Sequence, residues 1–522
     1  MKKIINSFTR SERQLFIGAV LVFLVSSIFW FAFNFQNKIE LTPKRGGQYR
    51  EGKTGQPIFI NPVISGNEAD RDIASLVYGH LSDLISDYQV EESVNYLVKL
   101  KQNLLWDDGQ PLTSDDVIFA IKTIQDPDAH SPLFQAWQGV VAERVSELQI
   151  RFILRNPYVF FTDSLRNLPV IPRHIFGKIP AANLRLSNYN LEPVGSGLYK
   201  FERFSKRKDG FITQYQLTVN KNYSGQKPYI EKFIFKFYEN EDDLIGAFNR
   251  REIDGFGGIN PSKIKNLSLS KNIRGIVIDN YYAIFFNQNI NSNLKDKNVR
   301  LALAQAVAKK QIIEKAFDGE ALEIGELPTA AGDLNLAAIR DKKMFPSEKY
   351  PEGIEFNLIV PQIPFLIKTA EIIKENWNAI GVKLNLIALN PDDIINQVIR
   401  SRDYEMILFG INPQNKEDLF SFWHSSQKFY PGLNLAIYGN PQADKLMEEI
   451  RRTDDSSERQ AKLKNLQAVI GQDWPAIFLY SPKYFYVSTN DLGGFKEKFL
   501  NTASDRFQNV KNWYVKTSFV LK

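Results

Sequence analysis

The stretch WDDGQPLTSDDVIFAIKTIQDP, residues 106–127, contains the most complete set of helix signals in the chain. Thr113 is of a type that caps helix N-termini, and Asp115 and Asp116 follow in the first turn, where carboxylates complement the helix dipole. Pro127 ends the segment, because proline cannot continue a helix. Four apolar residues recur on one face: Val117, Ala120, Ile121 and Ile124. The pattern predicts an amphipathic helix. Its two aspartates are expected to complement the helix dipole and not to act in catalysis.

A second helix is indicated by KDKNVRLALAQAVAKKQIIEKAFDG, residues 295–319. Asp296 is a candidate cap and Gly319 a candidate stop. An apolar stripe lies between them: Val299, Leu303, Ala306, Val307 and Ile313. We expect one helix with this stripe facing inward.

The segments between the helices are typical of strands. Five of them are rich in apolar, β-branched or aromatic residues: 148–154, 214–219, 229–237, 283–287 and 381–389. From Lys38 onwards, strand-like and helix-like segments alternate without low-complexity tracts, long linkers or internal repeats. The sequence therefore predicts one compact α/β body.

The N-terminus carries a long apolar run, LFIGAVLVFLVSSIFWFAFNF, in which residues 15–35 hold no charge. This length suffices to cross a bilayer core of about 30 Å as a helix. A cleavable signal peptide is the alternative, but its apolar region should be shorter and should end in small residues, whereas Trp30, Phe31 and Phe33 stand here. We expect an uncleaved membrane anchor at 15–35 behind a short basic tail at 1–14.

Composition excludes several classes of function. The chain has 522 residues, 43% hydrophobic and 24% charged, with a formal net charge of +6. Lys2, Lys3, Arg10 and Arg13 against Glu12 supply half of that charge, so the rest is close to balanced and no nucleic-acid groove is expected. Cysteine is absent, and the four histidines show no zinc spacing. We expect no metal site and no cofactor.

The stretch GGQYREGKTG, residues 46–55, matches a phosphate-binding loop from Gly47 to Thr54. Such a loop needs a buried strand before it and a helix after it, whose free N–H groups hold the phosphates. Pro43 is incompatible with the first and Pro57 with the second. We interpret the match, including its lysine, as incidental.

No catalytic constellation is found along the chain. Ser196 in VGSGLY lacks the spacing of a nucleophile elbow, and the match of Ser224 and Lys227 to S-x-x-K is isolated in a turn. The chain is therefore expected not to be an enzyme. Aromatic residues make up 13% of it, enough to line a ligand cleft as well as fill a core.

The order of the segments resembles a family, the extracellular solute-binding proteins of the peptide and nickel class that serve ABC importers. Its tryptophan, Asp-Gly, Pro-Leu-Thr, Asp-Asp-Val signature is similar to residues 106–117. Further matches follow in family order: RGGQY at Arg45, NPVISGNEADRDIASLVYGHL at Asn61, SPLFQAWQGV at Ser131, PRHIF at Pro172, EPVGSGLYKF at Glu192, FFNQN at Phe285, NVRLALAQAVAKKQII at Asn298, IKENWNAIGVKLNL at Ile373, SFWHSSQ at Ser421 and PAIFLYSPKYFYV at Pro475. The resemblance covers nearly everything after the apolar run.

The resemblance implies a two-lobed α/β fold of the type II periplasmic-binding-protein kind, with a hinge and a cleft that closes on the ligand. Lobe one would take residues 40–280 and the return at 490–522, and lobe two residues 281–489. The implied function is capture of short peptides by a monomeric extracytoplasmic protein, which its N-terminal helix holds at the cell membrane and which delivers the peptides to separate permease subunits. An extended peptide suits such a cleft, because its backbone can be bonded like an added strand.

The family lines its cleft at places that correspond here to twelve residues: Ile64, Ser65, Gly66, Tyr281, Tyr282, Gly410, Ile411, Asn412, Trp423, His424, Tyr484 and Tyr486. Each has a structural role as an alternative, since glycines make turns and tyrosines fill cores.

One departure from the family bears on the ligand. In peptide binders a carboxylate after a Gly-Trp pair commonly receives the ligand's N-terminal ammonium. Here the stretch FGINPQNKEDLF has Ile411, Asn412 and Pro413 in those places, with Glu417 and Asp418 further along as candidate substitutes. Two alternatives therefore stay open: the same fold binding a non-peptide solute, and a surface interaction module without a transport role.

Overall fold

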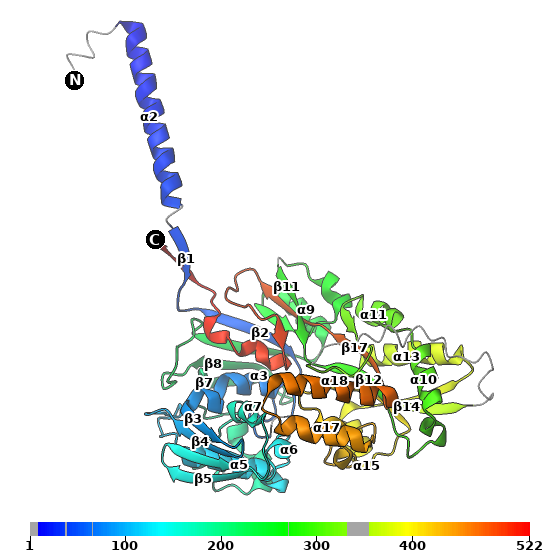
Figure 1. The fold of residues 1–522 in the computed structure, drawn as a ribbon. Coiled ribbons are helices and arrows are strands. Elements are labelled where there is room, and N and C mark those ends of the chain that lie inside the picture. Colours follow the sequence, from blue (N-terminus) through cyan, green and yellow to red (C-terminus); the bar gives the residue numbers. More distant parts are fainter. Residues whose placement is uncertain (1–8, 37–38, 65, 270, 331–353, 522) are drawn as a thin grey trace.

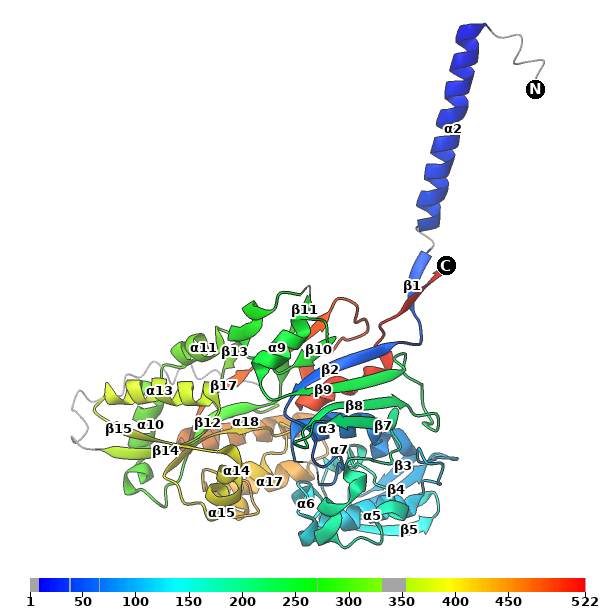
Figure 2. The same cartoon turned by 180° about the vertical axis from the view of Figure 1, so that it is seen from behind.

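The computed structural model describes residues 9–36, 39–64, 66–269, 271–330 and 354–521. A long helix, α2 (Arg10–Gln36), projects from the body (Figure 1). At its base β1 (Ile39–Pro43) pairs antiparallel with β20 (Thr517–Leu521), so the N-terminal and C-terminal segments lie side by side (Figures 1 and 2).

The helix α2 is the described helix that is long and apolar enough to cross a membrane. The stretch Arg10–Trp30 has a mean hydropathy of 1.8, and none of its most apolar part is buried in the body. A signal sequence has the same properties, so the helix is a signal or an anchor. Because it contributes nothing to the hydrophobic cores, the body retains every core without it.

The first half of the body is built on an eight-stranded mixed sheet. Its strands in spatial order are β19 (Phe499–Leu500), β11 (Lys271–Ile278), β18 (Tyr484–Thr489), β10 (Gly255–Gly257), β2 (Gln48–Thr54), β9 (Lys232–Tyr238), β8 (Ile212–Val219) and β7 (Tyr199–Lys206). The strand β2 contains the phosphate-loop match and pairs in parallel with β9 up to Thr54, so this segment is a strand and not a loop.

A four-stranded antiparallel sheet extends this half (Figure 1). Its order is β3 (Ile85–Glu91), β4 (Asn95–Leu100), β6 (Gln149–Ile153) and β5 (Val141–Ser146). The helices of this half are α3 (Glu68–Val77), α4 (Leu81–Leu84), α5 (Ser114–Gln125), α6 (Phe134–Trp137), α7 (Phe161–Arg166), α8 (Arg173–Phe176) and α9 (Glu241–Asn249). One large hydrophobic cluster spans both sheets.

Helix α5 confirms the prediction from the opening stretch. The Thr113 side chain accepts a hydrogen bond from the Asp115 N–H. The Thr113 N–H in turn donates to the Asp116 carboxylate at 2.9 Å, which completes a capping box. The four predicted apolar residues are buried. Asp116 also accepts from the backbone N–H of Arg173 at 2.9 Å, so the same carboxylate attaches α5 to α8.

The second half of the body is built on a six-stranded sheet. Its order is β13 (Ala321–Glu323), β17 (Ala476–Pro482), β12 (Tyr281–Phe286), β16 (Met406–Ile411), β14 (Glu355–Pro361) and β15 (Lys383–Leu389). Successive residues of β12 alternate between two hydrophobic clusters, with Ile284 in one and Phe285 in the other. Both faces of the sheet are therefore covered.

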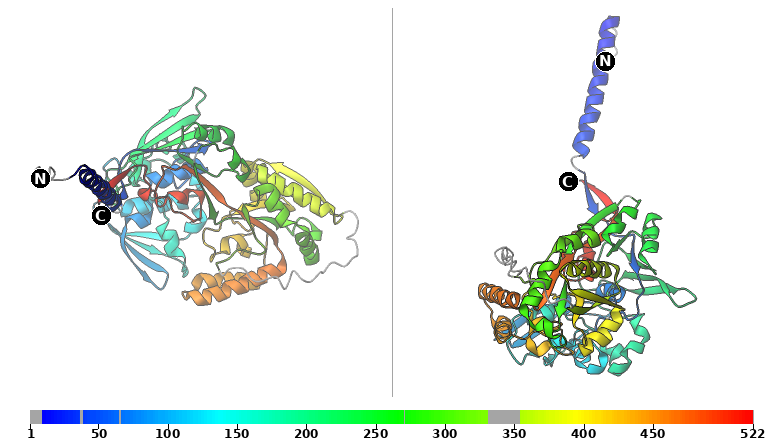
Figure 3. Two further views of the ribbon diagram at one scale, coloured as in Figure 1. Left: turned by 90° about the horizontal axis from the view of Figure 1, so that it is seen from above. Right: turned by 90° about the vertical axis from the view of Figure 1, so that its right-hand side faces the viewer.

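Helices pack on both faces of this sheet, as two further views show (Figure 3). They are α10 (Lys297–Ala306), α11 (Lys309–Phe317), α13 (Pro364–Asn378), α14 (Pro391–Asp393), α15 (Ile399–Ser401), α16 (Phe420–Trp423), α17 (Pro441–Arg452) and α18 (Ser456–Asp473). The two long helices α17 and α18 pack against each other and lie alongside the first half (Figure 1).

The prediction of one helix over 295–319 was wrong, because the chain breaks into α10 and α11. Val307 ends α10 in an extended conformation, and the Ala308 N–H donates at 2.9 Å to the Asn376 side chain on α13. This bond satisfies a backbone donor that a continuous helix would have used itself. The predicted apolar stripe nevertheless packs in or against one cluster.

The chain passes between the two large sheets at two places in the described residues. It leaves β11 at Ile278 and enters β12 at Tyr281, then leaves β17 at Pro482 and enters β18 at Tyr484. The chain thus passes from the six-stranded to the eight-stranded sheet seven residues before the expected lobe boundary between 489 and 490. The reason is that β18 pairs with β10 and β11 of the eight-stranded sheet.

Candidate functional site

The junction of the two sheets is held by polar contacts next to the crossing strands. Lys416, in the segment after β16, pairs with Asp279 at 2.9 Å, and Asp279 is almost fully buried. The Asn412 side chain donates to the backbone carbonyl of Asn501 in the first half. These contacts place residues after β16 directly against the first half.

A network of charged side chains is buried on one face of the eight-stranded sheet. Arg506, in the short helix η8 (Ala503–Phe507), donates to Glu51 at 2.9 Å and to Asp72 at 2.6 Å, and all three side chains are fully buried. Lys53 lies two residues after Glu51, so both side chains leave β2 on the same face. Its ammonium is 3.4 Å from Asp72 and also pairs with Glu68.

Burial and pairing shift the pKa values in this network in opposite directions. Burial opposes ionisation of Asp72, but Arg506 and Lys53 outweigh it and hold the pKa of Asp72 well below its usual range. Burial prevails at Glu51 and raises its pKa despite Arg506. Lys53 lowers the pKa of Glu68, which therefore stays ionised at neutral pH. The network consists of three carboxylates and two cationic side chains.

One edge of the network is open. The Glu68 side chain is 53% exposed, whereas that of Lys53 is 5% exposed. Tyr484 lies within electrostatic range of both, and its buried hydroxyl has no hydrogen-bond partner among the described residues. A Cβ at Gly257 would stand 1.9 Å from that hydroxyl oxygen, so glycine in β10 makes room for it.

Two expected site residues approach this edge from the six-stranded sheet. Tyr282 and Gly410 are paired in β12 and β16, and a Cβ at Gly410 would stand 2.7 Å from the Tyr282 ring. Burial and the charge of Glu68 raise the pKa of Tyr282 to about 12. Tyr282, which is paired with Gly410, thus lies within electrostatic range of Glu68 on the other side of the junction.

Several other expected residues lie in hydrophobic cores. Tyr281, Ile411 and Trp423 belong to one cluster of the six-stranded sheet, and Ile64 belongs to the cluster of the first half. Tyr486 is fully buried, where it donates to Glu51 at 2.7 Å. These five side chains serve packing or the charge network.

Three further expected residues lie apart from one another. Gly66 is exposed next to Glu68, and Asn412 contacts the first half as described. His424 is buried and stacks on Phe420 with ring centroids 4.0 Å apart. Ser65 lies outside the described residues.

The two candidate substitute carboxylates are already paired. Asp418 accepts two hydrogen bonds from Arg451 and one from the hydroxyl of Tyr158, which follows β6 in the first half. Glu417 accepts from Arg459 at 2.9 Å. Both carboxylates therefore hold helices α17 and α18 in place.

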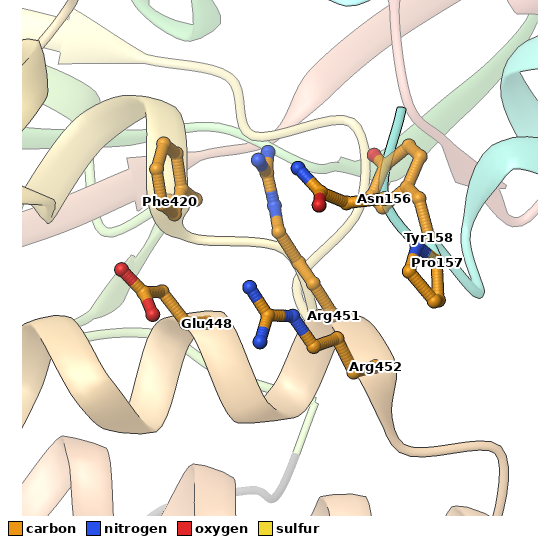
Figure 4. Close-up of a pocket in the computed structure, with 7 residues that line it drawn as sticks. All are labelled: Asn156, Pro157, Tyr158, Phe420, Glu448, Arg451 and Arg452. Carbon is orange, nitrogen blue, oxygen red and sulfur yellow. The ribbon is translucent and has the colours of Figure 1, made fainter. Parts of the chain in front are cut away.

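A cavity of about 240 Å³ lies beside this pairing (Figure 4). The Arg451 guanidinium stands between the rings of Phe420 and Tyr158, at 4.0 and 5.0 Å from their centroids. The lining residues are Asn156, Pro157, Tyr158, Phe420, Glu448, Arg451 and Arg452. The cavity is shared by the segment after β6 and helix α17, so it lies between the two halves.

Sequence reasoning missed Lys53, Glu68 and Arg506, and it was wrong to call Lys53 incidental. A signal was available in part: Glu51 and Lys53 are charged residues two apart in a strand, which places both on one face. The partners Glu51 and Arg506 are 455 residues apart in sequence, which no local pattern reveals. No group of His, Asp or Glu that would hold a metal ion occurs among the described residues.

Comparison with known proteins places the chain in a family. Residues 82–430 match the model described as bacterial extracellular solute-binding proteins, family 5 middle. The oligopeptide-binding protein AppA of Bacillus subtilis (strain 168) is 24% identical over 91% of this chain and 92% of its own length. The dipeptide-binding protein of Escherichia coli (strain K12) is 20% identical over 84% of this chain and 90% of its own length.

Two solved structures share the fold. AppA from Bacillus subtilis, in complex with a nonapeptide, aligns with a TM-score of 0.75 at 22% identity over 91% of this chain and all of that one. NikZ from Campylobacter jejuni, in complex with Ni(L-His), aligns with a TM-score of 0.71 at 21% identity over 90% of this chain and 99% of that one. The mixed α/β fold is therefore that of periplasmic binding proteins, and the chain belongs to the bacterial extracellular solute-binding proteins of family 5, the non-enzymatic binding components of ABC importers.

Proposed function

We propose that this protein captures short peptides in a cleft between two lobes and delivers them to the permease of an ABC importer. Lobe one comprises the eight-stranded and four-stranded sheets, and lobe two comprises the six-stranded sheet with its helices. The crossings at 278–281 and 482–484 are the hinge, because a described chain that passes twice between two packed bodies allows them to rotate.

The observation that carries this proposal is that Tyr282 of lobe two lies within electrostatic range of Glu68 of lobe one, which pairs with Lys53 near Tyr484. Residues from both lobes meet there, so a ligand bound between them would favour closure. The strand edges suit an extended backbone, since peptides bind by strand addition with their side chains in separate pockets. The relationship to AppA, solved with a nonapeptide, supports peptides as the ligand class.

The N-terminal helix anchors the body to the outer side of the membrane in this proposal. Its apolar run ends in aromatic residues instead of the small residues that a signal peptidase needs. A single span cannot form a transport path, so separate permease subunits complete the importer. The body acts as a monomer and takes no nucleic acid.

A second candidate is a non-peptide solute in the same cleft. It is favoured by the pairing of Glu417 and Asp418 with arginines, which leaves the segment after β16 without an open carboxylate for a peptide's ammonium. The relationship to NikZ, solved with a nickel–histidine complex, makes such a ligand reasonable for this fold.

Native mass spectrometry of residues 37–522 tests the ligand class. We expect discrete extra masses that denaturation resolves into short peptides. Release of a metal chelate or another small molecule would instead support the second candidate, a non-peptide solute. Bare protein that gains no mass from mixed peptides would reject peptide binding.

Anchoring needs a separate measurement on the full chain. Carbonate washing of membranes should leave the protein in the pellet with its N-terminal residues intact by mass. A soluble product that begins after residue 30 would show cleavage and reject the anchor.

A further inference from the structure

Glu68 has the most exposed side chain among the carboxylates of the charge network and those near the crossing strands. The candidates there are Glu51, Glu68, Asp72, Asp279, Glu417 and Asp418. Glu68 has a side chain 53% exposed, whereas the highest value among the other five is 21%, at Glu417. One oxygen of Glu68 faces Lys53, and no described residue donates to the other. An ionised carboxylate with an open acceptor is thus available to a ligand.

We propose that Glu68 receives a positively charged group of the ligand, an ammonium or a guanidinium. The inference rests on the proposed function and adds a selection for cationic ligands.

Tyr484 independently indicates a ligand at this place. Its side chain is more than nine-tenths buried, yet its hydroxyl is without a partner among the described residues. A buried hydroxyl without a partner costs roughly 1–3 kcal/mol, which a hydrogen bond to a ligand would recover. Gly257 leaves the space that this hydroxyl occupies, and any larger residue would displace it.

The charges around the site decide the sign of the ligand group. Lys53 and Arg506 face three carboxylates, and both cations are buried and already paired. With Glu51 ionised, the three carboxylates exceed the two cations by one charge, so the network repels an incoming anion and a cation balances it. Tyr282 from the opposite lobe offers a ring in the same region, and aromatic faces also attract cations.

Three pools of synthetic hexapeptides, otherwise made of uncharged residues, test the inference by native mass spectrometry with residues 37–522. The first pool has a free amino terminus, the second is N-acetylated and contains one lysine or arginine, and the third is N-acetylated without a basic residue. We expect the first or second pool to be retained about tenfold or more over the third, as a charge-assisted hydrogen bond implies. Preference for the first identifies the terminal ammonium as the group, and preference for the second identifies a side chain.

The variant Glu68→Gln should bring the preference to within about twofold, because it removes the charge and keeps the shape. Asp242→Asn is the matched control: Asp242 is an exposed first-turn carboxylate of α9 that also pairs with a lysine, and its replacement should leave the preference intact. Equal retention of all pools by the unmodified protein, or a preference that survives Glu68→Gln, would overturn the inference while peptide binding stands. Retention of no pool would overturn the peptide proposal and this inference with it.

Glu68→Gln disturbs the partner of Lys53, so folding is checked by circular dichroism and thermal unfolding. Glu68→Asp is the second variant, since it retains the charge and withdraws it by one methylene group. It should lower the preference about threefold or more, in keeping with a weakened charged hydrogen bond. If Glu68→Gln does not fold, Glu68→Asp decides the test. An unaltered preference in Glu68→Asp then overturns the inference.

Discussion

Arg451 binds both carboxylate oxygens of Asp418, with Nε 2.8 Å from Oδ1 and Nη2 2.8 Å from Oδ2. The Tyr158 hydroxyl donates to the same carboxylate at 2.7 Å, and the Val159 N–H donates to the Arg451 carbonyl at 2.9 Å. The segment after β6 is thereby attached to helix α17 on the far side of the junction. These contacts connect the two proposed lobes.

Replacing Asp418 by alanine should destabilise the protein. Arg451 would stay largely buried without its partner, and breaking a fully buried pair costs about 3–5 kcal/mol. Because the Arg451 side chain is 26% exposed, we expect about 2 kcal/mol, measured as a shift of the urea midpoint of residues 37–522. Asp454→Ala is the control, since its bond from Ser93 is exposed. Equal effects of the two variants would contradict a structural role for Asp418.

Replacing Tyr158 by phenylalanine should weaken the contact between the two proposed lobes, with little effect on the stability of either lobe. The change removes one hydrogen bond to a carboxylate across the junction, worth about 1–2 kcal/mol. We expect a larger radius of gyration by small-angle scattering without ligand, and ligand affinity about three- to tenfold lower. An unchanged radius together with unchanged affinity would mean that the contact does not take part in closure.

The stability of the protein should depend on the ionisation of Asp107. Burial raises the pKa of Asp107 to about 6, although the Gly195 N–H donates to it at 2.8 Å, whereas the unfolded value is about 3.9. Because the folded pKa lies above the unfolded one, the stability that protonated Asp107 contributes is fully present below pH 4. It is lost as the pH rises through 6.

Asp107→Asn keeps an acceptor for Gly195 and removes the buried charge. The variant should gain about 1–2 kcal/mol over the unmodified protein between pH 4 and pH 8. Urea unfolding at pH 4.5 and pH 8 measures this difference. A gain of the same size at both values of pH would show that the effect is not due to ionisation.

Gly257→Ala should disturb the site at the junction. The new Cβ would stand 1.9 Å from the Tyr484 hydroxyl oxygen, and the ring would have to move. Overpacking of this kind costs about 1–3 kcal/mol, so we expect a lower unfolding temperature and weaker ligand binding. Gly471→Ala is the control, because no atom lies within 4 Å of its Cβ position and alanine favours the helix α18. Wild-type binding by Gly257→Ala would exclude Tyr484 from the site.

What the sequence by itself determined is local. The caps and apolar spacing of α5 predicted that helix, because Thr113, Asp116 and the buried face all lie within one segment of chain. The prolines around the phosphate-loop match argued against a phosphate-binding loop, and the family resemblance covers the body as the comparisons do. The long apolar run at the N-terminus was equally evident, since membrane-length helices depend on composition alone.

The tertiary structure decided what depends on distant partners. Asn376 divides the segment 295–319 into two helices, and Arg451 binds the carboxylate of Asp418 that had been a candidate for the ligand. Lys53 acquires its place only when Asp72 and Arg506 pack against β2, which brings residues more than 430 positions apart into one buried network. Burial and ion pairing are set by such long-range packing, so the open carboxylate of Glu68 becomes evident only in the folded chain.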